Sequence, residues 1–497
     1  MSQINVSNLT FYYDGSYDNI FEDVSFSIDT NWKLGFIGRN GRGKTTFLNL
    51  LRGIYEYRGK ITKSVEVDYF PYEVSEDLMS QNTIEVMEHL QPEYELWKVC
   101  RELTLLQMDA EVLYRPINTL SYGEQTKALL ALLFSQENHF LLIDEPTNHL
   151  DLQARELVKD YLNSKSGFIL VSHDRNFLDA CIDHVLVINI TNIVVEAGNF
   201  SSWWENKRKQ DEYELTENSR LKKDISRLEV AARRTGEWGD KLEASKIGFN
   251  PMVKEKSIGT RSYIGEKSRR MQQRRKNLEH RQAKEIEDKK QLLKNLETME
   301  DLKLIPLEYH KERLIEARDF AIYYAGQKIT QDLNFTINRG DRVVLRGGNG
   351  CGKTSVIKYI LGGDIATEGE LIVANGLKIS YVCQDTSHLK GTLSEFMKEH
   401  NLEESLFKAI LRKLDFERLQ FDKPMENFSG GQKKKVVLAK SLCDQANLYI
   451  WDEPLNFVDI FSRMQIEQLI EEYHPTMLLV EHDRAFVEKI ATKIVEF

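Results

Sequence analysis

The sequence contains the same series of four short motifs twice, and this repetition limits the chain to folds built from two like domains. The first series occupies residues 38–175 and the second occupies residues 347–484. In each series a glycine-rich segment is followed by a serine–glycine segment, an apolar run that ends in Asp-Glu-Pro, and a His-Asp-Arg triplet. The interval between the first two motifs differs by only one residue between the copies. Equal order and near-equal spacing indicate a duplicated domain.

Each copy begins with an apolar run, at residues 34–37 and 343–345, that leads directly into the glycine-rich segment. A strand, a loop and a helix in this order form the basic unit of an α/β domain. We therefore expect one α/β domain at residues 1–203, a second at residues 306–497, and a separate connecting segment at residues 204–305.

Length and composition agree with folded domains and argue against a membrane protein. The 497 residues give room for about three units at roughly 100 to 200 residues each, and 41% hydrophobic with 29% charged residues favours globular domains over disorder. The longest apolar stretches, such as residues 128–134, fall short of the roughly 18 to 20 residues that a membrane span needs, and no secretory signal opens the chain. The 5 cysteines contain no C-x-x-C pair, which favours reduced thiols. We expect a cytoplasmic protein.

The two glycine-rich segments, GRNGRGKTT and GGNGCGKTS, have the phosphate-loop pattern between a strand and a helix. Their backbone N–H groups can surround phosphates, the lysine can reach the β- and γ-phosphates, and the hydroxyl after it can bind Mg²⁺. A glycine-rich structural turn is the alternative. The residues expected to bind ATP are Gly38, Asn40, Gly41, Gly43, Lys44, Thr45 and Thr46 in the first copy and Gly347, Asn349, Gly350, Gly352, Lys353, Thr354 and Ser355 in the second.

Two pairs of carboxylates are expected to form the hydrolytic centres. Asp144 and Asp452 end apolar strands, where they can act on the Mg²⁺ shell together with Thr45 and Thr354. The next residues, Glu145 and Glu453, can orient or deprotonate the attacking water, although a lone pair of this kind would more simply be a solvated strand end.

A histidine follows each carboxylate pair after another apolar run. His173 and His482 can contact the γ-phosphate or the attacking water, and a structural histidine is the alternative for each.

The connecting segment reads as helix, because it is rich in Lys, Arg, Glu, Gln and Leu and has Pro251 as its single proline between residues 204 and 303. Apolar residues recur at helical spacing on both sides of a glycine-containing stretch, which predicts a helical hairpin with an irregular tip at about residues 235–265. Residues 241–276 carry about 11 Lys and Arg against about 3 acidic residues, although the whole chain has a net charge of -10. Such a tip can bind RNA phosphates; a solvated charged face is the alternative.

The serine–glycine segments SGGQ, at residues 429–432, and SYGEQ, at residues 121–125, resemble the signature of ABC proteins. This resemblance implies that the signature of one domain completes the ATP site of the other. Ser429, Gly430, Gly431 and Gln432 would then join the first phosphate loop, and Ser121 and Gly123 the second. It also implies adenine stacking by Tyr13 and Tyr324, for which a core or surface tyrosine is the alternative.

The two halves differ at two further positions. Gln384 matches the glutamine that ABC proteins place near the metal, whereas Tyr72 occupies the corresponding position in the first half. Tyr122 likewise replaces the second residue of the signature, so the two ATP sites are expected to differ.

Two such domains joined by a helical hairpin resemble the F subfamily of ABC proteins, and the segment at residues 254–276 is similar to its lincosamide, streptogramin A and pleuromutilin resistance members from Gram-positive bacteria. The resemblance implies a monomeric ATPase whose two ABC domains pair within the chain. It would bind the 70S ribosome at the tRNA exit site, near 23S rRNA and the P-site tRNA, and displace antibiotics from the peptidyl-transferase centre. No membrane or permease partner is expected.

Three other functions share the nucleotide motifs. A transporter ATPase subunit would not need a long basic hairpin, and a chromosome-maintenance ATPase would carry its coiled coil inside one nucleotide domain. A housekeeping translation factor of the same subfamily would share the hairpin without the role in resistance.

Overall fold

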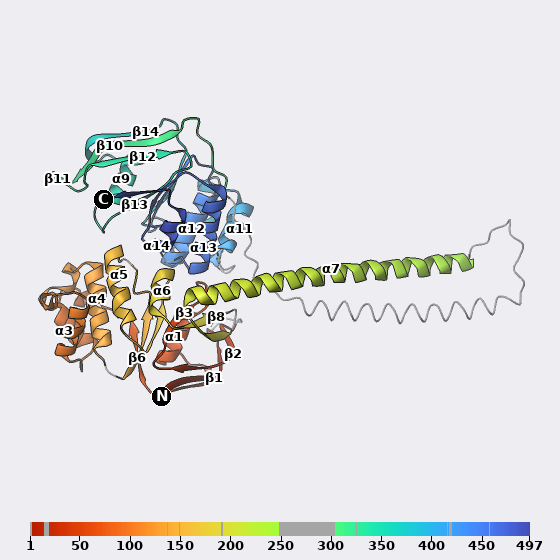
Figure 1. The fold of residues 1–497 in the computed structure, drawn as a ribbon, viewed down its shortest axis with the longest axis horizontal. Helices are drawn as coiled ribbons and strands as arrows, with labels where there is room; N and C mark the ends of the chain where they lie inside the picture. The colour runs from red at the N-terminus through yellow and green to blue at the C-terminus, as the bar shows by residue number, and fades with distance from the viewer. Residues whose placement is uncertain are drawn as a thin grey trace, which may run out of the picture. The chain divides into compact units, whose positions relative to one another are not determined.

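The computed structural model describes residues 2–13, 19–136, 138–148, 150–189, 192–247, 304–324, 326–414, 416, 420–456 and 458–497. The chain forms two compact units. One consists of Met1–Trp203 together with Met299–Phe497, and the other is Trp204–Thr298. The first unit contains both of the expected α/β domains (Figure 1).

The first domain contains an antiparallel and a mainly parallel sheet. The antiparallel sheet has the order β2-β1-β4, with β1 at Gln3–Phe11, β2 at Phe21–Asp29 and β4 at Arg58–Lys63. The larger sheet has the order β5-β6-β7-β3-β8-β9, in which β9 alone pairs antiparallel. Its strands are β3 (Lys33–Ile37), β5 (Glu66–Phe70), β6 (His139–Asp144), β7 (Phe168–Val171), β8 (His184–Ile188) and β9 (Ile193–Ala197).

The helices of the first domain bury their apolar faces against these sheets and one another. They are α1 (Lys44–Arg52), α2 (Thr83–Leu90), α3 (Leu96–Leu105), α4 (Tyr122–Phe134), α5 (Leu152–Asn163) and α6 (Arg175–Cys181). On α1, Phe47 is fully buried and its ring lies 5.4 Å from that of Phe36 and 6.0 Å from that of Phe21. This packing fixes the helix that follows the first phosphate loop.

The second domain repeats this plan. Its parallel sheet has the order β15-β16-β17-β13-β18, which matches β5-β6-β7-β3-β8, and its antiparallel sheet joins β11, β10, β12 and β14. The strands are β10 (Arg313–Tyr324), β11 (Gln327–Lys328), β12 (Leu333–Asn338), β13 (Arg342–Arg346), β14 (Ala366–Val373), β15 (Ile379–Val382), β16 (Leu448–Asp452), β17 (Met477–Val480) and β18 (Lys493–Glu496). The helices are α9 (Lys353–Ile360), α10 (Leu393–Glu399), α11 (Glu404–Lys413), α12 (Gly430–Cys443), α13 (Ile460–Tyr473) and α14 (Arg484–Ile490). The duplicated α/β fold predicted from the motifs is confirmed.

This topology brings the motifs of each half together. The phosphate loop follows β3 or β13, the Asp-Glu pair ends β6 or β16, and the histidine follows β7 or β17. These strands are adjacent and parallel, so their carboxyl ends lie at one edge of the sheet, where ligands of open α/β sheets bind.

The described part of the second unit belongs to one long helix, α7, which spans 48 residues at Phe200–Ile247 and starts at the end of the first unit. Pairs such as Lys207 and Asp211, whose charged atoms are 3.0 Å apart, link successive turns of α7. Ile225, one of the apolar residues that recur at helical spacing in this segment, is buried. We expected helical periodicity to end near residue 235, but α7 continues through Gly236 and Gly239. A glycine costs a helix only about 1 kcal/mol, which neighbouring turns can offset. The rest of the expected tip and the return helix lie outside the described residues.

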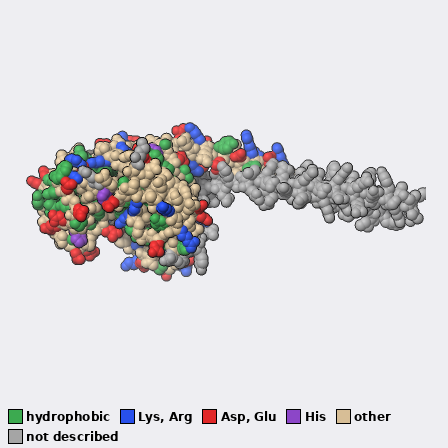
Figure 2. All heavy atoms as spheres, turned by 90° about the horizontal axis from the view of Figure 1, so that it is seen from below, with side chains coloured by type: hydrophobic (Ala, Val, Ile, Leu, Met, Phe, Trp, Pro, Cys, Tyr) green, Lys and Arg blue, Asp and Glu red, His purple; other side chains and the backbone are tan. Residues whose placement is uncertain are grey.

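Within the described part of the chain, no helix is both long enough and apolar enough to span a membrane. On the face shown in Figure 2, acidic and basic side chains are interspersed and form no extended basic area.

Candidate functional site

Both phosphate loops adopt a backbone that favours glycine. Gly43 and Gly352 cap α1 and α9 with φ angles of 92° and 100°, in the left-handed region. A Cβ atom at either glycine would lie 2.6 Å from a side-chain atom of Ile20 or Thr330. The glycines therefore allow each loop to bring its N–H groups to a helix N-terminus, where anions bind.

The two phosphate-loop lysines are buried and turned back onto their own loops. Lys44 Nζ donates to the carbonyl of Gly38 at 2.6 Å and to Asn40 Oδ1 at 3.3 Å. Lys353 Nζ donates to the carbonyls of Gly347 and Gly348 at 2.9 and 2.7 Å. Each ammonium group thus lies inside the loop that would surround the phosphates.

The residues expected to bind Mg²⁺ are brought together in the first half. Thr45 Oγ1 donates to Asp144 Oδ2 at 3.1 Å, and burial raises the pKa of Asp144. In the second half Asp452 is fully buried and contacts Thr354, but neither of its carboxylate oxygens accepts a hydrogen bond of normal geometry from the described residues. Burial raises its pKa to about 6. Buried oxygens without partners fit a site that gains stability from a cation.

The two glutamates after these aspartates share an unusual backbone. Glu145 and Glu453 have φ angles of 52° and 47°, which side chains other than glycine seldom adopt. Their N–H groups donate to the carbonyls of Val171 and Val480 at 2.9 Å in both halves. The neighbouring strand therefore holds each strained turn, and strain of this kind is concentrated at functional sites.

Each glutamate faces the expected histidine, but the two pairs differ. His173 Nε2 lies 3.3 Å from Glu145 Oε1, and His482 Nε2 lies 3.7 Å from Glu453 Oε1. Burial, with the nearby charge of Asp144, raises the pKa of Glu145 to about 8. Burial also acts to raise the pKa of Glu453, but its contacts with His482 and Gln384 outweigh burial and lower it.

This difference predicts unequal pH dependence. If Glu145 must lose its proton to act as a base, hydrolysis by the first site should rise several-fold between about pH 6.5 and 8, because its pKa is about 8. Hydrolysis by the second site should not rise for this reason, because the lowered pKa of Glu453 leaves it charged over that range. The Glu453→Gln variant keeps hydrolysis at the first site only, and the Glu145→Gln variant keeps it at the second site only. Measuring the ATPase rate of each variant as a function of pH compares the two sites. Identical profiles would contradict this prediction.

The signature segments form the N-termini of α4 and α12. Ser121 caps α4 in a capping box with Glu124, and Ser429 caps α12 in the same way with Gln432. The capping serines are exposed at these helix starts, where N–H groups favour an anion.

One cavity joins the first phosphate loop to the second signature. It has a volume of about 590 Å³. From the first domain it is lined by Asn40, Gly41, Glu145 and His173, and from the second by Phe416, Gln420, Ser429, Gly430, Gly431, Gln432 and Lys435. The cavity therefore brings Glu145 and His173 of the first domain together with Ser429 and Gly431 of the second, whereas Lys44, Thr45 and Asp144 do not line it.

The second composite site is less complete. A cavity of about 470 Å³ joins Gly347, Gly348 and His482 of the second domain to Asp151 and Gln153 of the first. Its lining includes neither Ser121 nor Gly123 of the first signature. Here α5 of the first domain, with the residue that caps it, reaches the second phosphate loop, while the signature does not line the cavity.

Two tyrosines expected to stack on adenine are tied to the phosphate-loop helices. Tyr13 shares a hydrogen bond of 2.8 Å with Thr46, and Tyr324 accepts one of 3.4 Å from Ser355. Both rings are partly exposed, as a stacking surface requires.

The tyrosine that replaces the first metal-side glutamine is held elsewhere. Tyr72 accepts a hydrogen bond from Gln91 Nε2, at the end of α2, at 3.3 Å. Gln384, its counterpart, contacts Glu453. The two halves therefore differ here in structure as well as in sequence.

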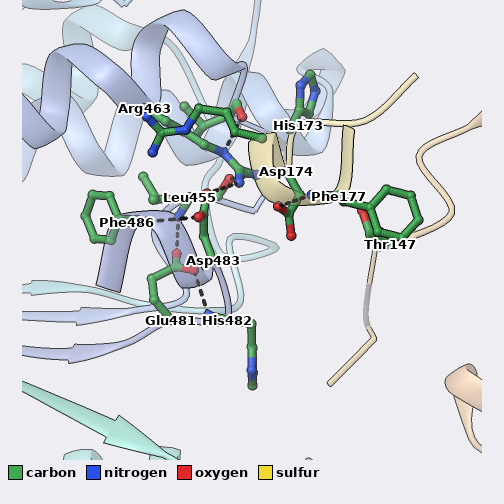
Figure 3. Close-up of polar contacts among 12 residues, drawn as sticks. Thr147, His173, Asp174, Phe177, Leu455, Arg463, Glu481, His482, Asp483 and Phe486 are labelled. Carbon is green, nitrogen blue, oxygen red and sulfur yellow. Dashed lines mark hydrogen bonds and ion pairs between the residues drawn. The ribbon is translucent and has the colours of Figure 1, made fainter. Parts of the chain in front are cut away.

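A buried network of charges crosses between the two domains. Arg463 donates to Asp483 Oδ2 at 2.9 Å, and the equivalent Arg155 lies 3.6 Å from Asp174 and donates to the carbonyl of His482 at 3.3 Å. Figure 3 shows this cluster, with the rings of His173 and His482 at opposite ends of it. Each histidine thus lies beside charges of both domains.

Sequence reasoning missed several residues of the first site. Tyr69 donates a hydrogen bond to Asp144, and Lys435, only 2% exposed, lies 3.3 Å from Asp459 on the wall of the composite cavity. The pair Lys435 and Asp459 acts electrostatically on Lys44 of the opposite domain. The signal for Lys435 was its place four residues, about one helical turn, after Gly431 of the signature on α12.

Comparison with known proteins gives a family match in both halves. The ABC transporter family matches residues 21–148 and 330–456. Both matches contain a phosphate loop, a signature and an Asp-Glu pair.

Relatives and solved structures extend the likeness over almost the whole chain. The ribosome protection protein VmlR of Bacillus subtilis (strain 168) is 29% identical over 96% of this chain and 84% of its own length. The ABC transporter F family member 2 of Arabidopsis thaliana is 24% identical over 100% of this chain and 76% of its own length. Among solved structures, the RNase-L Inhibitor superposes with a TM-score of 0.61 at 18% identity, covering 99% of this chain and 87% of that one. The structural likeness concerns the fold.

Proposed function

The chain belongs to the ABC transporter family and is an ATPase of its F subfamily, and from this premise we propose that it binds the ribosome and protects it from antibiotics. The observation that carries the proposal is the likeness to a ribosome protection protein over 96% of the chain, a span that includes the basic connecting segment. We propose that it acts in the cytoplasm as a monomer.

ATP would be held between the domains. At the first site, Lys44 and the loop N–H groups bind the phosphates, while Thr45 and Asp144 hold Mg²⁺. Glu145 orients and deprotonates the attacking water beside His173, and the second signature closes the site. Lys353, Thr354, Asp452, Glu453 and His482 act in the same way at the second site, with Gln384 near the metal. When bound, Mg²⁺ would supply positive charge that stabilises the charge developing on the phosphates.

The connecting segment would supply the RNA contact. Its basic residues lie in a chain whose net charge is -10, and the described face in Figure 2 shows no comparable basic area. Cationic side chains neutralise RNA phosphates, and aromatic residues of this segment, Trp238, Phe249 and Tyr263, can stack on bases. ATP binding and hydrolysis would then control entry and release of the segment at the tRNA exit site, near the P-site tRNA and 23S rRNA.

The basic segment should make ribosome binding sensitive to salt. Reversing the charge of Arg269, Arg270, Arg274 and Arg275 should weaken co-sedimentation with ribosomes and flatten its dependence on salt, because fewer counterions are released on binding. Hydrolysis without ribosomes should be unchanged. Reversal of four basic residues within residues 207–223 of α7 provides a matched control. Equal salt slopes for the wild type and the variant with four reversed arginines would rule out this contact.

The protective function is tested most directly in a purified translation reaction. Protein plus ATP should restore peptide synthesis that a lincosamide or a pleuromutilin has inhibited, because no membrane is present through which drug could be exported. A protein lacking residues 243–267 should not restore synthesis, although it keeps both ATP sites.

The possible results of this reaction distinguish ribosome protection from the two alternative functions, a translation factor and a transporter ATPase. Rescue by the protein that lacks residues 243–267 would show that the tip is not needed for protection. Absence of rescue by the intact protein, with ribosome binding preserved, would identify a translation factor without a role in resistance. Lower drug accumulation in cells, with no rescue in the purified reaction, would identify a transporter ATPase.

A further inference from the structure

A tyrosine that belongs to none of the nucleotide motifs contacts the metal-side carboxylate of the first site. Tyr69 lies on β5, next to β6, and its phenol donates to Asp144 Oδ2 at 3.2 Å. Thr45 Oγ1 donates to the same oxygen at 3.1 Å. Neither bond uses Oδ1. Two hydroxyls on one oxygen fix the rotation of the carboxylate and leave its other oxygen for a further partner.

The phenol is itself held in place. The guanidinium carbon of Arg52 lies 4.4 Å from the centre of the Tyr69 ring, and Arg52 also donates to Asn49 Oδ1 at 3.1 Å. Arg52 and Asn49 lie on α1, the helix that starts at the phosphate loop. Tyr69 therefore links three parts of the first site: α1, β5 and the carboxylate that ends β6.

The second site has the same residue but lacks the same contact. Tyr381 occupies the matching position on β15, three residues before Gln384 as Tyr69 is three before Tyr72. Both oxygens of Asp452 nevertheless lack a hydrogen-bond partner within the described residues. The second site has Gln384 where the first has Tyr72. The first site has the hydrogen bond from Tyr69 to Asp144, which has no counterpart in the second among the described residues.

We propose that Tyr69 is a positioning residue that orients Asp144 toward the Mg²⁺ of the first ATP site. It acts through Asp144 and does not itself touch nucleotide. A hydrogen bond to a charged group contributes more than one between neutral groups, so its loss should be measurable in the affinity for the cation. The proposal rests on ATP binding at this site and is independent of the ribosomal role.

The test measures the Mg²⁺ dependence of nucleotide binding. In a Lys353→Ala background, which removes the phosphate-binding lysine of the second site so that nucleotide binding reports the first, Tyr69→Phe should raise the Mg²⁺ concentration for half-maximal binding of a fluorescent ATP analogue by roughly tenfold. Binding of the analogue in EDTA should not change. The matched control is Tyr381→Phe in a Lys44→Ala background, which confines nucleotide binding to the second site; we expect less than about a twofold change, since that phenol makes no such bond.

A double-substitution cycle separates positioning from packing. In an Asp144→Asn protein, adding Tyr69→Phe should have no further effect on the Mg²⁺ dependence, because the partner through which Tyr69 acts is already altered. An unchanged Mg²⁺ dependence in Tyr69→Phe would overturn the proposal. So would an equal loss of binding with Mg²⁺ and with EDTA, or full additivity with Asp144→Asn, because each would assign Tyr69 a role in packing alone.

Discussion

Replacing Glu145 and Glu453 together with glutamine is expected to slow ATP hydrolysis by about 10² to 10⁴, because each site loses the group that can accept a proton from water. Binding of ATP should survive, since the phosphate loops and Lys44 and Lys353 are untouched. The double variant should therefore remain in the ATP-bound form and stay on ribosomes. Steady-state ATPase rates, equilibrium binding of ATP and co-sedimentation with ribosomes measure the three effects.

The two single variants are the controls for this prediction. Each should keep the hydrolysis of the other site, and the pH profiles of the two should differ as their pKa values differ. A double variant that hydrolyses ATP at the wild-type rate would show that neither glutamate is the base. Loss of ATP binding in the double variant would instead show that the glutamates support the phosphate loops.

Replacing Arg175 with alanine is expected to lower the free energy of unfolding of the compact unit by about 3 kcal/mol. Arg175 of the first domain makes a two-pronged ion pair with Glu467 of the second, one prong being a hydrogen bond of 3.2 Å from Nη1 to Oε2. Glu467 is fully buried, and its one other cation, among the described residues, is Lys489 at 3.4 Å. Removing the arginine leaves a buried charge poorly paired. Urea unfolding of the two proteins measures the difference.

The repeated sequence provides a matched control at Arg484, the counterpart of Arg175. Its partner is Glu488 on the same helix, and the two side chains are 55% and 62% exposed, so Arg484→Ala should cost only about 0.2 to 1 kcal/mol. The position equivalent to Glu467 is Lys159, which pairs with Glu156 and cannot form an ion pair with an arginine. Equal losses for Arg175→Ala and Arg484→Ala would show that the contact between the domains does not stabilise the unit.

Arg175 and Arg484 differ in the contacts that they make between the two domains. Among the described residues, Arg175 forms a strong ion pair with the other domain, whereas Arg484 forms an ion pair only within its own helix. The first composite cavity is lined by the signature of the second domain. The second cavity is lined by Asp151 of the first domain, but not by Ser121 or Gly123 of that domain's signature. The two ATP sites are therefore unequal in their contacts as well as in sequence, which agrees with the substitutions Tyr72 and Tyr122.

Short-range chemistry made much of this protein predictable from its sequence. A phosphate loop needs glycines, a lysine and a hydroxyl at fixed spacing, and a catalytic carboxylate at the end of an apolar strand can be recognised by position. Duplication of the whole series then established two α/β domains. The long helix was also predicted from periodicity, although its extension through Gly236 and Gly239 was not, because neighbouring turns of a helix can offset the cost of a glycine.

What only the tertiary structure decided are the contacts between residues far apart in the chain. Tyr69 and Asp144 are adjacent because β5 pairs with β6 in parallel, and Arg175 meets Glu467 because the two domains pack within one unit. The pKa values of Glu145 and Glu453 move in opposite directions although both follow an aspartate in the same motif. Burial and neighbouring charges set these shifts, and both depend on which distant side chains the fold places around each carboxylate. A motif therefore determines which group can act, while the packing around it determines the charge and orientation with which that group acts.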